Sequence, residues 1–263
     1  MLPVRSKSKP FKIIYLVLVL LLLYTPILYT ALFSFNESIL GGFSGFTLKW
    51  YEYVFTDSTI MDAVFVTFSI ALLASLFSTV VGTFAAIGFF SMKKGSRMLW
   101  GAVNNIPVVN PDIVTGISTM LVFAYVGLGG GYFSLFLAHS AFCIPYVVLS
   151  VLPKLQTLNP QYYEAALDLG ATPMLAIRRV VLPQIRSGII TGVLLAFTMS
   201  LDDFAVSYFV TQGSDINTLS TLIYSAAKMG VKPYFNALSV MIFISIFILM
   251  LIINKRTDIT ELY

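Results

Sequence analysis

Residues 113–153 read IVTGISTMLVFAYVGLGGGYFSLFLAHSAFCIPYVVLSVLP and contain no Asp, Glu, Lys or Arg. A helix crosses the hydrocarbon of a bilayer with about 20 apolar residues, so this 41-residue stretch must hold two crossings. The glycine-rich segment at 127–131 predicts the turn between them. The stretch therefore predicts a helical membrane protein.

The composition of the whole chain agrees with this prediction. Of its 263 residues, 58% are hydrophobic and 11% are charged, whereas soluble domains have about 45–50% and about 25%. This excludes a soluble globular domain. We expect an all-α integral membrane protein with six transmembrane helices, at 13–35, 60–90, 99–126, 132–152, 187–208 and 234–254. The first apolar run is too long for a signal peptide, which predicts a retained membrane anchor.

The positions of the Lys and Arg residues predict the orientation. Thirteen of the sixteen fall in four segments that the six-span arrangement places on one side: the tail 1–12, the loop 91–98, the loop 153–186 and the tail 255–263. Positive loops stay in the cytoplasm, so both termini are expected there. The net charge of +4 is thus assigned to membrane topology, and no nucleic-acid partner is expected.

Two outer segments are expected to carry structure of their own. The outer loop 36–59 is rich in aromatic residues, which predicts a short segment at the membrane interface. The moderately apolar stretch Leu219 to Met229 predicts a short outer helix.

The cytoplasmic loop 153–186 has the punctuation of two short helices. Asn159-Pro160 at the start and Gly170 past the end predict a helix over 160–169. Thr172-Pro173 repeats the start signal and predicts a second helix over about 173–181. We therefore expect this loop to be folded.

A pair of carboxylates marks the first of these helices. Glu164 and Asp168 lie four residues apart on one face, where like charges cost an isolated helix a few tenths of a kcal/mol. Ala165 and Ala166 permit close approach of another surface. Two interpretations stay open: a solvated acidic face, or a docking surface for a cytoplasmic protein bearing cations.

The same loop carries a longer pattern. Glu164-Ala165-Ala166, Gly170 after three residues, and Val180-Val181-Leu182-Pro183 after nine more resemble the EAA signature of permease subunits of ABC importers. The one departure is Val180, where that signature has Ile. The resemblance implies the type I ABC importer permease fold. It also implies that Glu164, Ala165, Ala166, Asp168 and Gly170 couple this chain to a separate ATPase. Since the sequence has no G-x-x-x-x-G-K-[ST] motif, ATP and Mg are expected on that partner, and no cofactor is expected on this chain.

Three further strings narrow the resemblance. The segments 46–51 (FTLKWY), 106–113 (IPVVNPDI) and 200–204 (SLDDF) are similar to the PotC-type permeases of spermidine/putrescine importers. This implies a polyamine substrate and a location in the bacterial cytoplasmic membrane. The implied partners are a cytoplasmic ATPase dimer, a second permease subunit forming a heterodimer, and an extracytoplasmic polyamine-binding protein. Spermidine is not distinguished from putrescine.

Four residues are candidates for the substrate pathway. An ionisable group at membrane depth is expensive unless it lines a cavity or has a partner, which marks Asp112. Asp112 also fits the first turn of a helix, where the dipole favours an anion. Asp202 and Asp203 are expected near the outer end of the fifth span, with one facing the path and the other packed or solvated. Trp50 has the ring to receive a cation, or to anchor the chain at the interface.

The remaining chemistry-bearing residues are expected to be structural. His139 is predicted to hydrogen-bond between helices, and Cys143 to be a buried small residue. Gly188 and Gly192 predict close helix packing, and Pro107 with Pro111 predicts a broken third helix. No catalytic residue or metal site is expected.

Two alternatives to an ABC permease for polyamines stay open. One is an ABC permease for another small solute, and the other is an ion-coupled secondary transporter, which would not need the folded loop. An intramembrane enzyme is the weakest candidate, because catalytic motifs are missing.

Overall fold

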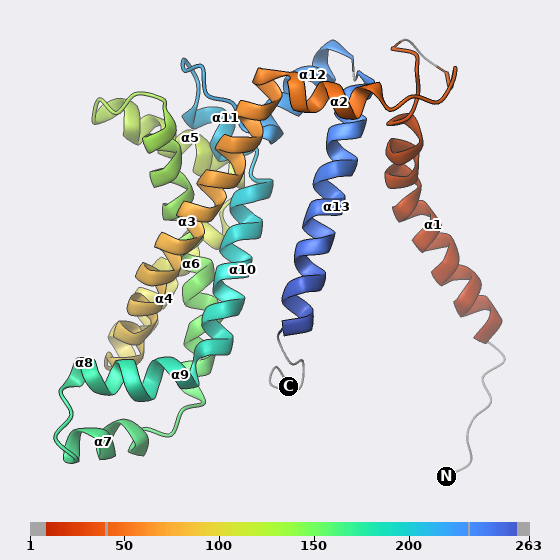
Figure 1. The fold of residues 1–263 in the computed structure, drawn as a ribbon. Coiled ribbons are helices and arrows are strands. Elements are labelled where there is room, and N and C mark those ends of the chain that lie inside the picture. The colour runs from red at the N-terminus through yellow and green to blue at the C-terminus, as the bar shows by residue number, and fades with distance from the viewer. Residues whose placement is uncertain (1–8, 40–41, 231, 257–263) are drawn as a thin grey trace. The chain divides into compact units, whose positions relative to one another are not determined.

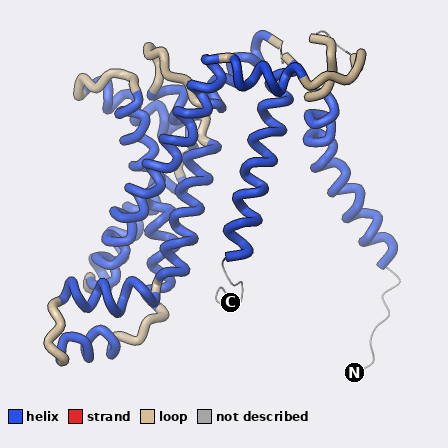
Figure 2. The backbone as a smooth tube through the Cα atoms, viewed as in Figure 1, coloured by secondary structure: helices blue, strands red, loops and turns tan. Residues whose placement is uncertain are grey.

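The computed structural model describes residues 9–39, 42–230 and 232–256, and these are overwhelmingly helical (Figures 1 and 2). The only extended pairing within those ranges is an isolated bridge between Asn36 and Phe46. The predicted all-α fold class is confirmed. The described residues divide into two compact units, one within 9–61 and 225–256 and the other within 62–224.

The first unit is built around its last helix. It contains three helices: α1 (Lys9–Phe33), α2 (Lys49–Thr56) and α13 (Pro233–Arg256). Both α1 and α2 pack against α13. Along α1, most of the described apolar side chains are exposed, which suits a helix surrounded by hydrocarbon.

The buried Asn36 stabilises the turn between α1 and α2 through hydrogen bonds. Its side chain accepts a hydrogen bond from the backbone N–H of Ser44 at 2.9 Å and donates one to the carbonyl of Gly42 at 2.9 Å. The indole N–H of Trp50 donates to the Asn36 carbonyl at 2.7 Å. The loop 36–59 therefore contains a short structured segment, as its aromatic content predicts.

Asp57 caps the start of the next helix, α3 (Ser58–Ser91). Its carboxylate accepts hydrogen bonds from the backbone N–H of Ile60 at 3.0 Å and from the hydroxyl of Tyr53 at 2.8 Å. The Ile60 bond and then the Tyr53 bond hold the pKa of Asp57 below its ordinary value. The same hydroxyl bond raises the pKa of Tyr53.

The second unit has a tightly packed helical centre. Helix α6 (Tyr132–Gln156) lies along α10 (Arg186–Asp202). The α10 glycines allow this contact, because a Cβ at Gly188 would come within 3.0 Å of the Ser150 carbonyl, and one at Gly192 within 3.2 Å of Val147. The predicted glycine packing is confirmed. The buried core around it comprises Ala86, Cys143, Val147, Val148, Val151, Leu155, Val181, Ile185 and Ala196.

Three helices have the length and apolar character of straight membrane crossings: Lys12–Phe33 within α1, all of α3, and α6. They match the predicted spans 13–35, 60–90 and 132–152. The predicted third and fifth spans fall in bent helix pairs, which raises the number of spans to as many as five. The predicted sixth span falls in α13, whose apolar part is assigned over Pro233–Ile248.

The third span is broken, as predicted, and the break lies beside Pro111, whereas Pro107 lies within a helix. Helix α4 (Lys94–Val109) contains Pro107, and α5 (Asp112–Tyr125) follows at an angle of 104°. The break is at Asn110-Pro111 because a proline disfavours helical geometry in the residue before it. Asn110 accordingly has an extended backbone, with ψ of 136°. Asp112 lies in the first turn of α5, as predicted.

The fifth span is not the continuous helix that was expected over 187–208. Helix α10 ends at Asp202, Asp203 has an extended backbone, and a short helix α11 (Ala205–Val210) follows. The side chain of Asp203 stabilises this break by accepting hydrogen bonds from α11, as described below.

The loop 153–186 contains the two predicted helices. The first is α7 (Gln161–Asp168). The second runs over Pro173–Gln184 as α8 (Pro173–Ala176), a π-helical turn (Ile177–Val181) and α9 (Leu182–Gln184). It bends by 75° into α10. Figure 1 shows these loop helices at the opposite end of the second unit from α5 and α11. The helix predicted over Leu219 to Met229 is also present, as α12 (Leu219–Met229).

Candidate functional site

A cavity of about 310 Å³ lies where the two broken helices meet. Asp112 reaches it from the α4–α5 break, and Asp202 and Asp203 reach it from the α10–α11 break. Three of the four predicted pathway residues are thus brought together. The rest of the lining is mostly apolar and aromatic: Pro107, Ile113, Thr115, Phe142, Tyr146, Thr198, Met199, Phe204, Ala205 and Val206.

The two breaks are held together by close backbone contact. Gly116 of α5 faces α11 so closely that a Cβ there would come within 2.9 Å of the Ala205 carbonyl and 3.0 Å of the Phe209 ring. A residue with a side chain would push the two helices apart. Glycine at this position therefore helps to shape one wall of the cavity.

The three carboxylates have different surroundings. Asp112 and Asp202 are exposed, and neither side chain makes a hydrogen bond or ion pair within the described ranges. The side chain of Asp203 is 7% exposed. Its two oxygens accept hydrogen bonds from the backbone N–H groups of Val206 at 3.2 Å and Ser207 at 2.7 Å. Asp203 therefore satisfies two of the donors that the start of a helix leaves free.

The side chain of His139 is buried beside Asp203. One ring nitrogen, Nδ1, is 2.7 Å from the Ser200 hydroxyl of α10. The other, Nε2, is 3.0 Å from the Ser207 hydroxyl of α11 and 3.5 Å from Asp203 Oδ2. The predicted interhelical hydrogen bonding of His139 is confirmed. Cys143, one turn further along α6, is buried as predicted and donates to the Ala196 carbonyl at 3.3 Å.

The α6 side of the cavity was not predicted from the sequence. Phe142 and Tyr146 line it, and with His139 they follow a spacing of three and four residues. That spacing places all three on one face of a helix. This spacing could have indicated the face of α6 that lines the cavity, but the apolar residues on its other faces obscured it.

Trp50 lies in the first unit, and its surroundings account for its burial. It is 8% exposed and its ring lies against Tyr53 and Tyr234, with centroids 6.4 and 6.3 Å away. The Lys49 ammonium nitrogen is 4.7 Å from the centre of the ring. Of the two roles left open for Trp50, these contacts favour the anchor.

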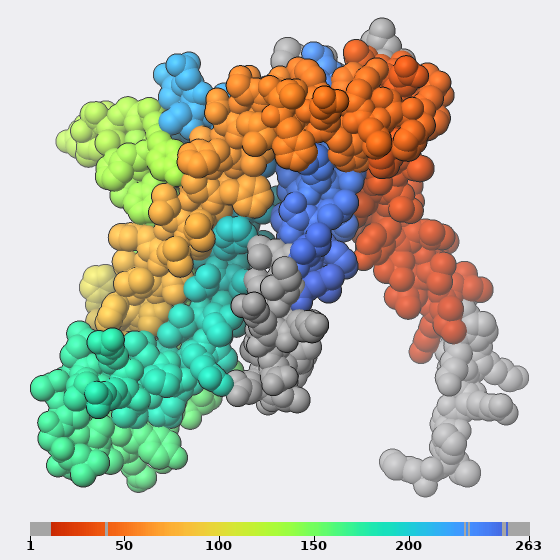
Figure 3. Space-filling model, viewed as in Figure 1, coloured from red at the N-terminus to blue at the C-terminus, as the bar shows by residue number. Residues whose placement is uncertain are grey.

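The loop helix α7 presents most of its predicted coupling residues outward. Tyr163 packs against the core of the second unit, which holds the helix in place. Glu164, Ala165 and Asp168 are exposed, and Ala166 is half-buried. The helix ends as predicted, because Gly170 has a φ of +83°, which favours glycine. The loop thus presents an ordered acidic surface, seen in Figure 3 as part of the green and teal lobe.

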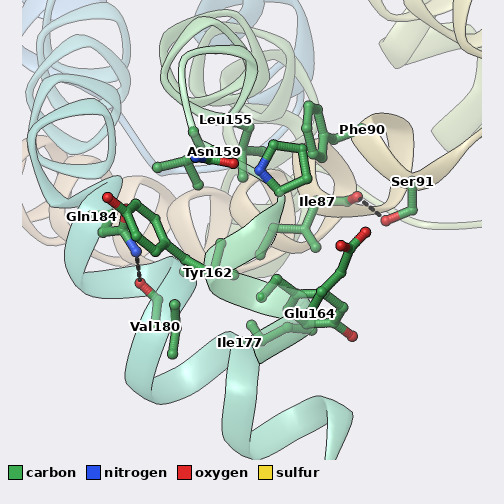
Figure 4. Close-up of a pocket in the computed structure, with 14 residues that line it drawn as sticks. Ile87, Phe90, Ser91, Leu155, Asn159, Tyr162, Glu164, Ile177, Val180 and Gln184 are labelled. Atoms are coloured by element: carbon green, nitrogen blue, oxygen red, sulfur yellow. Dashed lines mark hydrogen bonds between the residues drawn. The ribbon is translucent and has the colours of Figure 1, made fainter. Parts of the chain in front are cut away.

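A second cavity, of about 200 Å³, separates this loop from the end of α3 (Figure 4). Ile87 and Phe90 line it from α3, and Tyr162 and Glu164 from α7. At the end of α7, Leu169 is 90% exposed, although an apolar residue at the end of a short helix normally packs inward. Leu169 was not singled out from the sequence.

Broken apolar helices around an acidic cavity, with a folded loop at the other end of the unit, define a solute-transporting membrane permease. The chain belongs to the family of binding-protein-dependent transport system inner membrane components, which matches residues 2–258. It is therefore a type I ABC importer permease and not an enzyme.

The relatives it resembles are named for polyamine transport. The chain is 36% identical over 231 residues to the spermidine/putrescine transport system permease protein PotC of Haemophilus influenzae, covering 87% of this chain and 90% of that protein. It is 36% identical over 242 residues to the putrescine transport system permease protein PotI of Escherichia coli, covering 89% and 85%.

Its fold matches that of a bacterial ABC transporter involved in the import of the acidic polysaccharide alginate. The TM-score is 0.70 at 16% identity, covering 98% of this chain and 100% of that one. This agreement extends over nearly the whole chain and confirms the fold.

Proposed function

We propose that this chain moves polyamines, spermidine or putrescine, across the bacterial cytoplasmic membrane by alternating access. The observation that carries the proposal is the cavity lined by Asp112, Asp202 and Asp203, in a chain whose relatives are named as polyamine permeases. A polyamine is a flexible apolar chain bearing several ammonium groups. Carboxylates and aromatic faces are the groups that attract such ammonium ions.

The position of Asp202 supports a cationic substrate. It is the last residue of α10, where the final carbonyls lack helical partners and the helix dipole is negative. Transporters use such broken-helix ends to bind cations. A cation in the cavity would therefore be attracted by both the carboxylate and the end of the helix.

We propose that the acidic face of α7 docks onto a cytoplasmic ATPase dimer. Glu164, Ala165 and Asp168 are exposed and Gly170 sets the turn beside them. ATP and Mg would bind to that partner, and its closure would move the loop 160–182. A second permease subunit would complete the pathway as a heterodimer, and an extracytoplasmic polyamine-binding protein would deliver the substrate.

We further propose six crossings, with α4–α5, α10–α11 and α13 each completing one, and both termini in the cytoplasm. The distribution of Lys and Arg supports this orientation. Impermeant labelling of single cysteines in the loop 91–98 and in the outer loop 36–59, in a Cys143→Ser background, tests it. Labelling of both loops from the same side would overturn it.

The proposed function is tested by reconstitution of the chain with its co-purifying partners in liposomes. ATP-dependent uptake is measured for spermidine, putrescine, amino acids and sugars. We expect uptake of polyamines alone, and its loss in Asp112→Asn combined with Asp202→Asn. Loss is also expected in Glu164→Arg combined with Gly170→Trp.

The alternatives predict other results. Uptake of a different solute with ATP would identify an ABC permease for that solute. Uptake driven by an ion gradient without ATP would identify a secondary transporter and overturn the assigned coupling role of the loop.

A further inference from the structure

The adjacent carboxylates Asp202 and Asp203 line the same cavity and have different contacts. We propose that they have different roles. Asp202 contacts the substrate cation, whereas Asp203 and His139 are positioning residues that stabilise the geometry of the helix break. This proposal rests on the proposed function, because it assigns roles within the same cavity.

The contacts of Asp203 are those of a helix cap. Both of its oxygens accept backbone hydrogen bonds from α11, at 3.2 and 2.7 Å, and its side chain is 7% exposed. A short helix that starts at a break needs such an acceptor, because its first N–H groups have no helical partner. A substrate that drew this carboxylate away would leave those N–H groups unpaired.

His139 joins the two sides of the break. Through Ser200 it contacts α10, and through Ser207 it contacts α11, at 2.7 and 3.0 Å. Its Nε2 is also 3.5 Å from Asp203 Oδ2. A single buried ring therefore holds the end of α10 and the start of α11 in place. Because Asp202 is the last residue of α10, this also sets the orientation of its side chain.

Asp202 has none of these restraints. It is exposed and makes no hydrogen bond or ion pair in the part of the chain that the structure describes. Since its neighbour is committed to α11, Asp202 is the carboxylate of the pair that is available to a cation. Asp112, also exposed at the opposite break, is its counterpart across the cavity.

Two matched substitutions separate these roles. Asn caps helices about as well as Asp and carries no charge, although its single oxygen replaces only one of the two acceptors of Asp203. We therefore expect Asp203→Asn to keep polyamine uptake within about threefold of the wild type. We expect Asp202→Asn to lower it by at least about tenfold, as loss of a charge partner does. The reverse order, with Asp203→Asn the more damaging, would overturn the proposal.

Accessibility gives a second test that needs no knowledge of the substrate. In a Cys143→Ser background, a thiol reagent bearing an ammonium group is applied to Asp202→Cys and Asp203→Cys in the assembled complex. We expect fast labelling at 202 and at least about tenfold slower labelling at 203, because buried thiols react slowly. Equal labelling at both positions would overturn the proposal. If polyamines are not transported but this labelling difference holds, the proposed substrate fails and the division between the two positions stands.

His139 is tested by comparison of a conservative and an apolar variant. His139→Gln keeps polar atoms near both serines, whereas His139→Leu removes them. We expect uptake to stay within about threefold in the first and to fall at least about tenfold in the second. Both variants should assemble and keep the basal ATP hydrolysis of the complex, which a misfolded permease would not. Equal uptake by the Leu variant and the wild type would overturn the positioning role.

Discussion

Glycine can be required at position 170 for its backbone conformation or for lack of space, and the structure distinguishes these two reasons. Gly170 ends α7 with a φ of +83°, and its N–H donates to the Leu167 carbonyl at 2.9 Å, while that of Ala171 donates to the Ala166 carbonyl at 3.0 Å. Apart from its chain neighbours, no atom of the described residues lies within 4 Å of the place that a Cβ would take. Within this chain, a substitution therefore adds backbone strain and no clash.

The magnitude follows from this conformation. A left-handed backbone costs an L-residue about 1–2 kcal/mol, and Asn tolerates it better than other residues with a side chain. Each 1.4 kcal/mol is a factor of about ten in an equilibrium constant. We expect Gly170→Ala to open this turn roughly 5–30 times more often than the wild type, Gly170→Asn less, and Gly170→Val more.

Hydrogen exchange of the Gly170 and Ala171 amides measures that opening, with ATP-dependent uptake measured in parallel. We expect both readouts to rank the variants as wild type, Asn, Ala, Val. If uptake instead falls with side-chain size, so that Asn is worse than Ala while exchange is unchanged, close approach by a partner is the reason for the glycine and the strain argument is refuted.

Three further predictions concern the frame around these sites. Gly116→Ala would place a Cβ 2.9 Å from the carbonyl that begins α11, and we expect it to destabilise the second unit by about 1–3 kcal/mol. A lower thermal midpoint checks this. The control is Gly101→Ala, inside α4 and with no described atom beyond its neighbours within 4 Å of the added Cβ, which should leave the midpoint unchanged or raise it. Asp57→Ala should cost about 1 kcal/mol at pH 7 through loss of a helix cap. Because the pKa of Asp57 is lowered in the folded protein, its contribution to stability is present above the ordinary pKa and is lost as the pH falls through the folded value. The difference in melting temperature between Asp57→Ala and the wild type should therefore shrink in acid. A difference that does not change with pH would contradict the role of the Asp57 carboxylate as the cap. Arg97 donates to three carbonyls at the end of α3, so Arg97→Ala should lower stability by about 2 kcal/mol and Arg97→Lys by less, and equal melting of all three proteins would exclude this cap.

The parts of the structure that the sequence predicted well are those set by local chemistry. The first loop helix was predicted from Asn159 and Gly170, and in the structure the Asn159 side chain accepts a hydrogen bond from the Gln161 N–H at 3.0 Å. The proline at 111 predicted a break because its effect on the preceding residue needs no tertiary contact. Long apolar runs predicted α1, α3 and α6 for the same reason.

The break after Asp202 could not be predicted in this way. No Pro or Gly occurs between Gly192 and Gly213, so local propensity favours a continuous helix. The break is stabilised by Asp203 and by His139, whose contacts span 61 and 68 residues of sequence. Contacts at such distances depend on the packing of α6 against α10 and α11, which a single sequence does not reveal.

The two breaks also explain why the acidic residues cluster where they do. A helix that ends inside a membrane protein leaves unpaired N–H groups at one end and unpaired carbonyls at the other, and both are costly in an apolar setting. Asp112 and Asp203 lie at the starts of α5 and α11, where a negative group is favoured. Asp202 lies at the end of α10, where a negative group is disfavoured and the free carbonyls add to its field. Helix stability therefore accounts for two of the three carboxylates and not for Asp202, whose charge is complementary to a cation in the cavity.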